Sequence, residues 1–294
     1  MFFRKKRKSE LLVSKTKFNR ENFGHTGSED DFNKATIHFI TFADGSDDIR
    51  GAGERLKNQS ESSHWFNTST IYNLQRIKEA DKDWWNKHID FIASNTRGLG
   101  FWIWKPKVIS LQLQKANLGD YVVYADAGYE INILGINRFR DYIALANQYG
   151  FLTWEIRDQD IGTWTKGDTL NYFSAIDDNN ITKRKQLEFN LQVIHVTNET
   201  REFYEALSEV TVALNYKLVD DSPSFINNES GFIDHRHDQA IATLFSIKEK
   251  KGIFLPHEGY LSEYWNKGIH PAEIPFATLR NKTSKSKLIY KKEE

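Results

Sequence analysis

The run Val122-Val-Tyr-Ala-Asp-Ala-Gly128 places a carboxylate, Asp126, directly after a short apolar segment. A short apolar run bounded by turn residues is typical of a buried strand, so we expect Asp126 at the rim of a sheet. Gly128 lets a backbone or a ligand approach closely. Hard cations such as Mg²⁺ or Mn²⁺ take oxygen ligands and keep several waters, so one or two carboxylates with a diphosphate complete a site. The alternative is an Asp that only caps the next segment or forms an Asx-turn.

A second run, Arg97-Gly-Leu-Gly-Phe-Trp-Ile-Trp-Lys-Pro106, combines a glycine-rich bend with a predicted helix start, because proline is tolerated in a first helical turn. Free N–H groups at a helix start bind anions. Arg97 and Lys105 add positive charge, and Trp102 offers a flat face for a base or a sugar. The spacing matches neither a Walker A loop nor a dinucleotide-binding fingerprint. Alternatively, the aromatic residues of this run simply pack in the core.

Two further groups could take part in the same chemistry. Trp164-Thr-Lys166 offers an aromatic face and an ammonium that would neutralise a phosphate, unless Lys166 is an ordinary surface lysine. His235-Arg-His-Asp-Gln239 opens a predicted helix, where Asp238 could act as a general base or only complement the helix dipole. Glu155 is a second candidate base. His257 is an isolated histidine, and such residues are more often structural than ligands.

The segments around these residues alternate between strand and helix patterns, which predicts an α/β fold with a mostly parallel central sheet flanked by helices. In such sheets, ligands bind beyond the carboxyl ends of the strands. The strands that we expect are residues 35–42, 121–125, 151–156, 191–196 and 253–255. The helices that we expect are about residues 67–79, 81–94, 106–117, 137–149, 198–214 and 235–248, and the segment 43–48 is interpreted as a turn-rich loop.

The composition excludes several classes of protein. The chain has 294 residues and no cysteine, which rules out a disulfide scaffold, a thiolate metal site and a cysteine nucleophile. No apolar run approaches the ~20 residues that span a bilayer. Aromatic residues make up 14% of the chain, and four of the 8 Trp lie between Trp102 and Trp164, among the motifs described above.

The zero net charge conceals an uneven distribution. Residues 1–20 carry a formal charge of +7, residues 281–294 carry +3, and the body between them carries −10. An acidic body repels phosphates, so we expect no nucleic-acid partner. The basic run from Arg4 to Lys8 is either a solvated tail or a contact with an anionic membrane surface.

We therefore divide the chain into a basic polar lead-in (1–34), a single domain (35–280) and a Lys-rich mobile tail (281–294). We expect a cytoplasmic protein, with residues 1–8 as the candidate for peripheral contact with the inner face of the membrane.

The order and spacing of these motifs resemble a group of bacterial and viral glycosyltransferase-like proteins from polysaccharide gene clusters. The resemblance extends from about Ile37 to about Lys248 and includes the runs that begin at Arg97, Gly119, Trp164 and His235. It implies a GT-A-like (Rossmann-like) fold, that of the nucleotide-diphospho-sugar transferases.

By this resemblance, Thr41, Phe42 and Ala43 would meet the nucleotide, and Asp126 would hold a metal and the diphosphate. GT-A enzymes often have an Asp-x-Asp motif, and this chain has Gly128 in the second acidic place. The metal, Mn²⁺ or Mg²⁺, would then have Glu130 or His257 as a further ligand. Alternatively, Asp126 and waters alone would hold the metal, or the site would use no metal.

The resulting hypothesis is a glycosyltransferase that moves a hexose-type sugar from a nucleotide-diphosphate donor to a glycan or glycolipid acceptor. The leaving diphosphate must be stabilised and the acceptor hydroxyl must lose its proton. The rivals are a non-catalytic carbohydrate-binding relative and a nucleotidyltransferase. The roles that we assign are as follows: Asp238 and Glu155 catalytic; Thr41, Phe42, Ala43, Arg97, Lys105, Asp126 and Lys166 at the donor; Trp102, Trp164, His235 and Gln239 at sugar or acceptor; Asp126 and His257 at the metal.

Overall fold

A seven-stranded sheet forms the centre of the protein in a computed structural model that describes residues 11–14, 27–259 and 267–290. The basic run from Arg4 to Lys8, and with it the predicted membrane contact, lies outside these residues. The strands follow the order β3-β2-β4-β8-β6-β7, and β9 pairs with β6. They are β2 (Ile37–Phe42), β3 (Thr68–Tyr72), β4 (Tyr121–Ala125), β6 (Phe151–Asp160), β7 (Lys185–Leu187), β8 (Leu191–His195) and β9 (Ile253–Pro256).

Most of these strands run in the same direction. β2 is parallel to both β3 and β4, and β9 is parallel to β6. β8 is antiparallel to β4 and β6, and β7 is antiparallel to β6, so five of the seven strands share one direction. The expected α/β architecture with a mostly parallel central sheet is confirmed. The carboxyl ends of β2, β4 and β6 therefore meet at one edge of the sheet.

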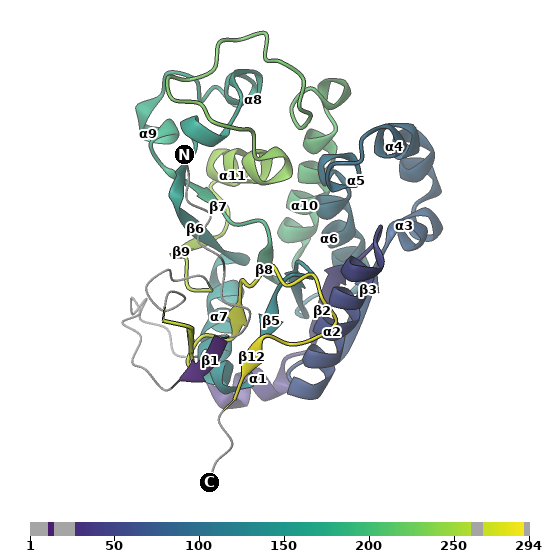
Figure 1. Ribbon diagram of the computed structural model, residues 1–294, viewed down its shortest axis with the longest axis vertical. Coiled ribbons are helices and arrows are strands. Elements are labelled where there is room, and N and C mark those ends of the chain that lie inside the picture. The colour runs from purple at the N-terminus through teal and green to yellow at the C-terminus, as the bar shows by residue number, and fades with distance from the viewer. Residues whose placement is uncertain (1–10, 15–26, 260–266, 291–294) are drawn as a thin grey trace.

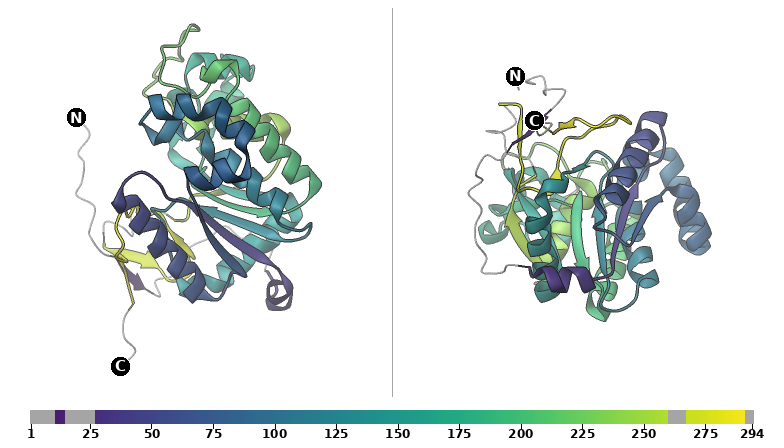
Figure 2. Two further views of the ribbon diagram at one scale, coloured as in Figure 1. Left: turned by 90° about the vertical axis from the view of Figure 1, so that its right-hand side faces the viewer. Right: turned by 90° about the horizontal axis from the view of Figure 1, so that it is seen from below.

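Helices cover both faces of the sheet (Figures 1 and 2). Alternate side chains of each strand point to opposite faces, so Phe39 and Val123 join one core cluster while Ile40 and Tyr124 join the other. The first cluster packs against α2 (Asp47–Ser63) and α7 (Ile136–Tyr149). The second packs against α6 (Trp104–Lys115), α10 (Asn198–Thr211) and α11 (His237–Glu249).

The segment between β2 and α4 (Lys82–Ser94) differs from the sequence prediction. The predicted loop at 43–48 contains the start of α2, where the Ser46 side chain accepts a hydrogen bond from the backbone N–H of Ile49. The predicted helix over 67–79 is wrong in its first part, because Thr68–Tyr72 is the edge strand β3. The helix α3 (Leu74–Ala80) begins only after Asn73, which caps it.

Several short elements complete the fold. No helix within the described ranges is long and apolar enough to span a membrane. The short helices are α1 (Glu29–Lys34), α5 (Gly98–Phe101), α8 (Gly167–Tyr172) and α9 (Asn179–Thr182), with 3₁₀ turns at Ile133–Gly135, Gly162–Trp164 and Leu214–Tyr216. The short strands are β1 (Leu11–Ser14), β5 (Glu130–Ile131), β10 (Ile269–Pro271), β11 (Phe276–Ala277) and β12 (Leu288–Ile289).

The two ends of the chain meet in a small second sheet. β1 pairs in parallel with both β10 and β12, so parts of the predicted lead-in and tail lie side by side near the bottom of Figure 1. Residues 281–290, predicted as part of a mobile tail, instead pack against α2 and β5. Asn281 is fully buried there, and Glu130 accepts hydrogen bonds from the backbone N–H groups of Lys287 and Leu288.

Candidate functional site

Asp126 lies at the end of the most buried strand of the sheet. All five residues of β4 are buried, and β4 is held between β2 and β8. The backbone N–H of Asp126 donates to the carbonyl of Asn190, and its own carbonyl accepts from Tyr129, which closes a turn. One third of the Asp126 side chain is exposed. The predicted position at the rim of the sheet is therefore confirmed.

The ammonium of Lys105 lies behind Asp126. Its Nζ is 3.1 Å from Asp126 Oδ1, 3.4 Å from Asp238 Oδ2 and 3.4 Å from the side-chain oxygen of Asn190. Lys105 is almost completely buried. Burial alone would lower its pKa, but the carboxylates of Asp126 and Asp238 raise it overall, so the ammonium remains charged.

The bend before α6 positions this lysine. Five consecutive residues, from Gly98 to Trp102, have positive φ angles, and the backbone then enters α6. A left-handed conformation costs a non-glycine residue roughly 1–2 kcal/mol. The ring of Trp104 helps to hold this bend, because it stacks on Phe42 at 3.6 Å and donates from its indole nitrogen to the carbonyl of Gly98.

Asp238 is the second carboxylate of the site. It lies in the first turn of α11, and its side chain is only 7% exposed. Its Oδ2 is buried and has no hydrogen-bond partner in the described part of the chain, although the Lys105 ammonium lies 3.4 Å away. Burial, and then the charge of Asp126, raise the pKa of Asp238 to about 6 against the opposing effect of Lys105. Asp238 thus changes its protonation state close to neutral pH.

Two of the predicted diphosphate ligands are already paired with acids. Lys166 is buried, and its ammonium lies 2.7 Å from Asp220. The guanidinium of Arg97 is 2.9 Å from Asp221 and 3.3 Å from Asp234. Neither cation forms an ion pair or a hydrogen bond with Asp126 or Asp238 within the described residues, so the structure does not bring them to the carboxylate pair.

The histidines that open α11 are also held by the protein. His235 is buried, with Nε2 2.8 Å from the carbonyl of Leu218, and burial lowers its pKa well below the usual value. His237 stacks on Phe101 and lies 2.9 Å from Asp221. His235 is therefore held by the protein itself, and its predicted role as a sugar ligand stays a prediction.

The predicted aromatic platforms are partly covered. The guanidinium of Arg236 lies 3.8 Å from the centre of the Trp164 ring. One face of Trp164 is therefore occupied. Trp102 packs over Gly98 and beside His237. The amide of Gln239 donates to Gln159.

The end of β2 reaches the same edge of the sheet as Asp126. Thr41 is buried, and its hydroxyl has no hydrogen-bond partner among the described residues. Phe42 is occupied by its stack on Trp104, and Ala43 packs against Gly53 of α2. Their predicted role at the nucleotide stays a prediction.

The remaining two candidates lie on β6 and after β9. Glu155 is partly buried in β6, in register with Leu187 of β7 and Pro256 of β9. His257 Nε2 is 3.0 Å from the buried carboxylate of Glu188, which also accepts a hydrogen bond from Tyr129. Burial alone would raise the pKa of Glu188, but the interactions with His257 and Tyr129 lower it overall. His257, Glu188 and Tyr129 therefore form an internal network of an ion pair and a hydrogen bond.

The donor set does not fit the predicted metal. No group of three or more His, Cys, Asp or Glu that could hold a metal ion occurs among the described residues. The ammonium of Lys105 already lies between Asp126 and Asp238, where a cation would bridge two carboxylates. Glu130 is also unsuitable, because Asn281, Ser286 and the backbone of residues 287–288 donate to its carboxylate.

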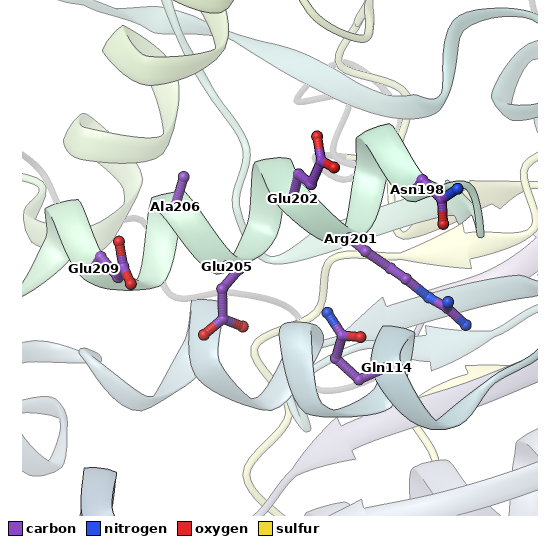
Figure 3. A pocket seen from close by; sticks show the side chains of 7 residues that line it. All are labelled: Gln114, Asn198, Arg201, Glu202, Glu205, Ala206 and Glu209. Atoms are coloured by element: carbon purple, nitrogen blue, oxygen red, sulfur yellow. The ribbon is translucent and has the colours of Figure 1, made fainter.

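A separate hollow of about 430 Å³ lies between α6 and α10 (Figure 3). β8 is antiparallel to β4, and His195 at its end pairs with Tyr121 at the start of β4. The following helix α10 therefore starts at the edge of the sheet opposite Asp126. The hollow is lined by Gln114, Asn198, Arg201, Glu202, Glu205, Ala206 and Glu209, and its three glutamates make it a poor site for a phosphorylated ligand.

No family model and no curated protein matches the chain. Among solved structures, a glycosyltransferase involved in the glycosylation of the major capsid of PBCV-1 matches with a TM-score of 0.42 and 8% identity over 82% of this chain and 91% of its own. Mouse xyloside xylosyltransferase 1 in its apo form matches with a TM-score of 0.43 and 6% identity over 79% and 89%. The galactosyltransferase LgtC, with donor and acceptor sugar analogues, matches with a TM-score of 0.35 and 12% identity over 81% and 86%. At such low similarity, any assignment of function has to rest on the site itself.

Proposed function

We propose that the protein is a GT-A-like glycosyltransferase, which moves a sugar from a nucleotide-diphosphate donor to a glycan or glycolipid acceptor in surface polysaccharide synthesis. The observation that carries the proposal is the pair of carboxylates, Asp126 and Asp238, at the carboxyl edge of the sheet with the buried Lys105 between them. Ligand sites of α/β sheets lie at this edge. Three of the four resembling motifs contribute one residue each: the run from Arg97 contributes Lys105, the run from Gly119 contributes Asp126, and the run from His235 contributes Asp238.

The reaction needs one proton acceptor and one stabilised leaving group. The oxygen of the acceptor hydroxyl forms a bond to the anomeric carbon, the bond from that carbon to the diphosphate breaks, and the bonding electrons leave with the diphosphate. The proton of the hydroxyl passes to Asp238. A base with a pKa of about 6 is ionised at neutral pH and can still hold the proton that it takes.

The unpartnered oxygen of Asp238 supports this role. A buried carboxylate oxygen without a hydrogen bond costs free energy, roughly 1–3 kcal/mol or more for a charged group. A hydroxyl of the acceptor would supply the missing donor. Asp126, which is more exposed, would face the donor, and Lys105 would hold the two carboxylates at a fixed separation.

The test combines binding and turnover. A panel of nucleoside diphosphates and nucleotide sugars is screened by thermal shift, because a ligand that binds only the folded state raises the melting temperature. Release of nucleoside diphosphate from the sugar donor that binds is then measured for Asp238→Asn and for a control, Glu202→Gln, in the hollow at the opposite edge. We expect a loss of at least 100-fold for Asp238→Asn and none for the control. Full activity of folded Asp238→Asn would refute the assignment.

A non-catalytic carbohydrate-binding relative is the second candidate. It is favoured by Gly128 in the place of a second acid and by the misfit of the described residues to a metal site. It predicts binding of a sugar or nucleotide sugar, with no hydrolysis of the donor over many hours.

The membrane contact through residues 1–8 stays part of the proposal. Deleting these residues should weaken binding to vesicles that contain anionic lipid and leave transfer to a soluble acceptor unchanged. Equal binding of the full and shortened chains would refute it.

A further inference from the structure

The small sheet that joins the two ends of the chain is apolar on both faces. Its inner face, with Leu11 and Leu288, is buried in a core cluster of its own. Side chains alternate along a strand, so Leu12 and Ile289 point to the outer face, and the register places them side by side. Ile269 of β10 is the partner of Leu12 on its other side. The outer face therefore carries a row of three aliphatic side chains, one from each strand, which we call the outer row.

The outer row is only partly covered by the described residues. Ile289 is 42% exposed, and Leu12 and Ile269 are partly buried. The small sheet lies at the periphery of the molecule (Figures 1 and 2). Parallel sheets with apolar side chains on both faces normally have both faces covered. We therefore expect a surface outside the described chain to complete the cover of this face.

The apolar surface continues onto the turn before α7. The hydroxyl of Tyr290 donates to a backbone carbonyl of β5 at 3.4 Å, and the amide of Asn132 donates to three carbonyls at and after the end of β10. Both contacts hold this turn beside the small sheet. Its residues Ile133 and Leu134 are 49% and 50% exposed, and Tyr290 is 38% exposed. Together with Ile289, they are four of the eleven large apolar side chains that are exposed within the described ranges.

The segments that build this corner are basic. Residues 267–290 contain five Lys or Arg and a single Glu. Lys267 is exposed and is separated from β10 by one residue, and Lys287 directly precedes β12. In the sequence, two residues separate the basic run that ends at Lys8 from β1. Because the body of the chain is acidic, an anionic surface attracts this corner and repels the rest of the protein. A second copy of the chain would bring like charges together, so repulsion disfavours it as the cover.

We propose that the outer row, together with Tyr290 and the turn at Ile133–Gly135, is a membrane-binding surface for an anionic bilayer. The aliphatic side chains would lie at the boundary between the lipid headgroups and the acyl chains, and the lysines would face the lipid phosphates. Tyrosine suits this position, because its ring is apolar and its hydroxyl is polar. The inference goes beyond the contact proposed for residues 1–8, since it assigns a surface of the folded chain, and it does not depend on the transferase reaction.

The chain has no cysteine, so a single introduced cysteine carries a fluorescent label without ambiguity. The environment-sensitive label NBD is attached to Ile289→Cys in the outer row and to Leu118→Cys, a position before β4 whose side chain is 56% exposed. Vesicles of phosphatidylcholine are added, with and without phosphatidylglycerol. With the anionic vesicles, we expect the emission of the first label to shift to shorter wavelength and that of the second to stay unchanged. Removal of residues 1–8 should raise the lipid concentration that gives half of the shift and leave its size unchanged.

Binding to the same vesicles is then measured by co-sedimentation. We expect the paired change Ile269→Ser with Ile289→Ser to weaken binding about tenfold, because less apolar area enters the bilayer. The matched control is Leu118→Ser, which removes an exposed aliphatic side chain elsewhere and should leave binding unchanged. The melting temperature of each variant shows that it is folded. Should the paired variant not fold, Ile289→Ser alone changes an exposed side chain and is expected to weaken binding about threefold.

Three outcomes would overturn the inference. Vesicle binding with unshifted emission of labelled Ile289→Cys would leave the membrane contact to residues 1–8 alone. A shift that needs no vesicles and grows with protein concentration, with dimers in analytical ultracentrifugation, would mean that a second copy covers the outer row. Equal binding to vesicles without phosphatidylglycerol would show that charge does not direct the contact.

Failure of the proposed function is a separate result. A chain that binds vesicles through the outer row but turns over no nucleotide sugar would refute the transferase and keep the membrane-binding surface. An active transferase whose label at Ile289→Cys does not respond to vesicles would keep the proposed function and refute the surface.

Discussion

The ammonium nitrogen of Lys105 lies 3.4 Å from Oδ2 of Asp238, an oxygen that no hydrogen-bond donor of the described residues satisfies. The attraction of Lys105 lowers the pKa of Asp238, but burial raises it more, and the result is a pKa of about 6. Above that pH the folded protein holds an ionised, incompletely bonded carboxylate. Such a group weakens the fold and at the same time provides a base.

We predict that Asp238→Asn stabilises the protein at neutral pH. The folded-state pKa of Asp238, about 6, lies above its ordinary value of 3.8, so the folded state binds more protons than the unfolded state between these values. The free energy of unfolding of the wild type therefore falls as pH rises from about 4 to 6, by about 3 kcal/mol in total. Asparagine does not titrate, so the advantage of Asp238→Asn should grow over this interval and then stay constant.

Urea unfolding at a series of pH values measures this difference. Glu202→Gln, which removes an exposed acid from α10, is the control and should keep the pH dependence of the wild type. A variant Asp238→Asn that is less stable than the wild type at pH 7 would show that the carboxylate is fully compensated in the folded state.

The second prediction concerns the pH dependence of transfer. In the wild type, kcat/KM should rise with pH through about 6 and level off above it, because Asp238 accepts a proton only when it is ionised. Lys105→Met removes the charge that lowers the pKa of Asp238. Its profile should therefore shift to higher pH, and its activity at pH 7 should fall and partly recover in alkaline buffer.

Lys105→Met also leaves two carboxylates without their cation, which typically costs 3–5 kcal/mol. Asn190→Ala is the milder companion variant, since Asn190 contacts Lys105 only through its side-chain oxygen at 3.4 Å. It should lower the activity slightly and leave the inflection near pH 6. An unshifted profile in a folded Lys105→Met variant would exclude Asp238 as the titrating base.

Local signals in the sequence were enough to predict the sheet strands and the position of Asp126. β4 and β8 combine apolar runs with turn residues, and their ends were predicted to within one residue. The sequence was misleading at β3, where Thr68–Tyr72 is rich in β-branched residues but lies directly before a helix. Pairing with β2, which no local pattern reveals, decides its conformation.

The candidate site was predicted only as separate groups. Asp126, Lys105 and Asp238 were each identified from their own run, and the fold brings them together. The motifs did not reveal that Asp220 pairs with Lys166, since a counter-ion 54 residues away leaves no local signal. The close contact between Gly128 and the backbone at Arg280 was missed for the same reason, because it depends on hydrogen bonds from the distant Arg55 to both segments.

The third prediction tests the network that holds the C-terminal segment. Glu130 is fully buried, and its carboxylate accepts from Asn281, from Ser286 and from the backbone of residues 287–288. Glu130→Ala leaves these donors unsatisfied in a buried place, so we expect a loss of about 3–5 kcal/mol in the free energy of unfolding. Ser286→Ala, which removes one of the bonds, should lose only about 1 kcal/mol.

Limited proteolysis provides a second measurement for the same pair of variants. Cleavage within residues 281–290 should become fast in Glu130→Ala and remain slow in Ser286→Ala. Stability equal to that of the wild type in Glu130→Ala would mean that the segment contributes nothing to the fold.

The fourth prediction concerns the small sheet that joins the two ends of the chain. His270 of β10 is buried and donates from Nε2 to the carbonyl of Ile274, and burial lowers its pKa to about 4 from an ordinary value of 6.5. The unfolded state therefore binds more protons than the folded state between pH 6.5 and 4. The free energy of unfolding should fall by about 3 kcal/mol as pH decreases through this interval.

His270→Gln keeps an N–H donor without the titration, so it should remove this acid-induced loss. Hydrogen exchange of the β1 amides at Leu12 and Val13, which lie in register with Ile269 and His270, should accelerate on acidification in the wild type and not in His270→Gln. Equal acceleration in both would show that another group controls the acid response of this sheet.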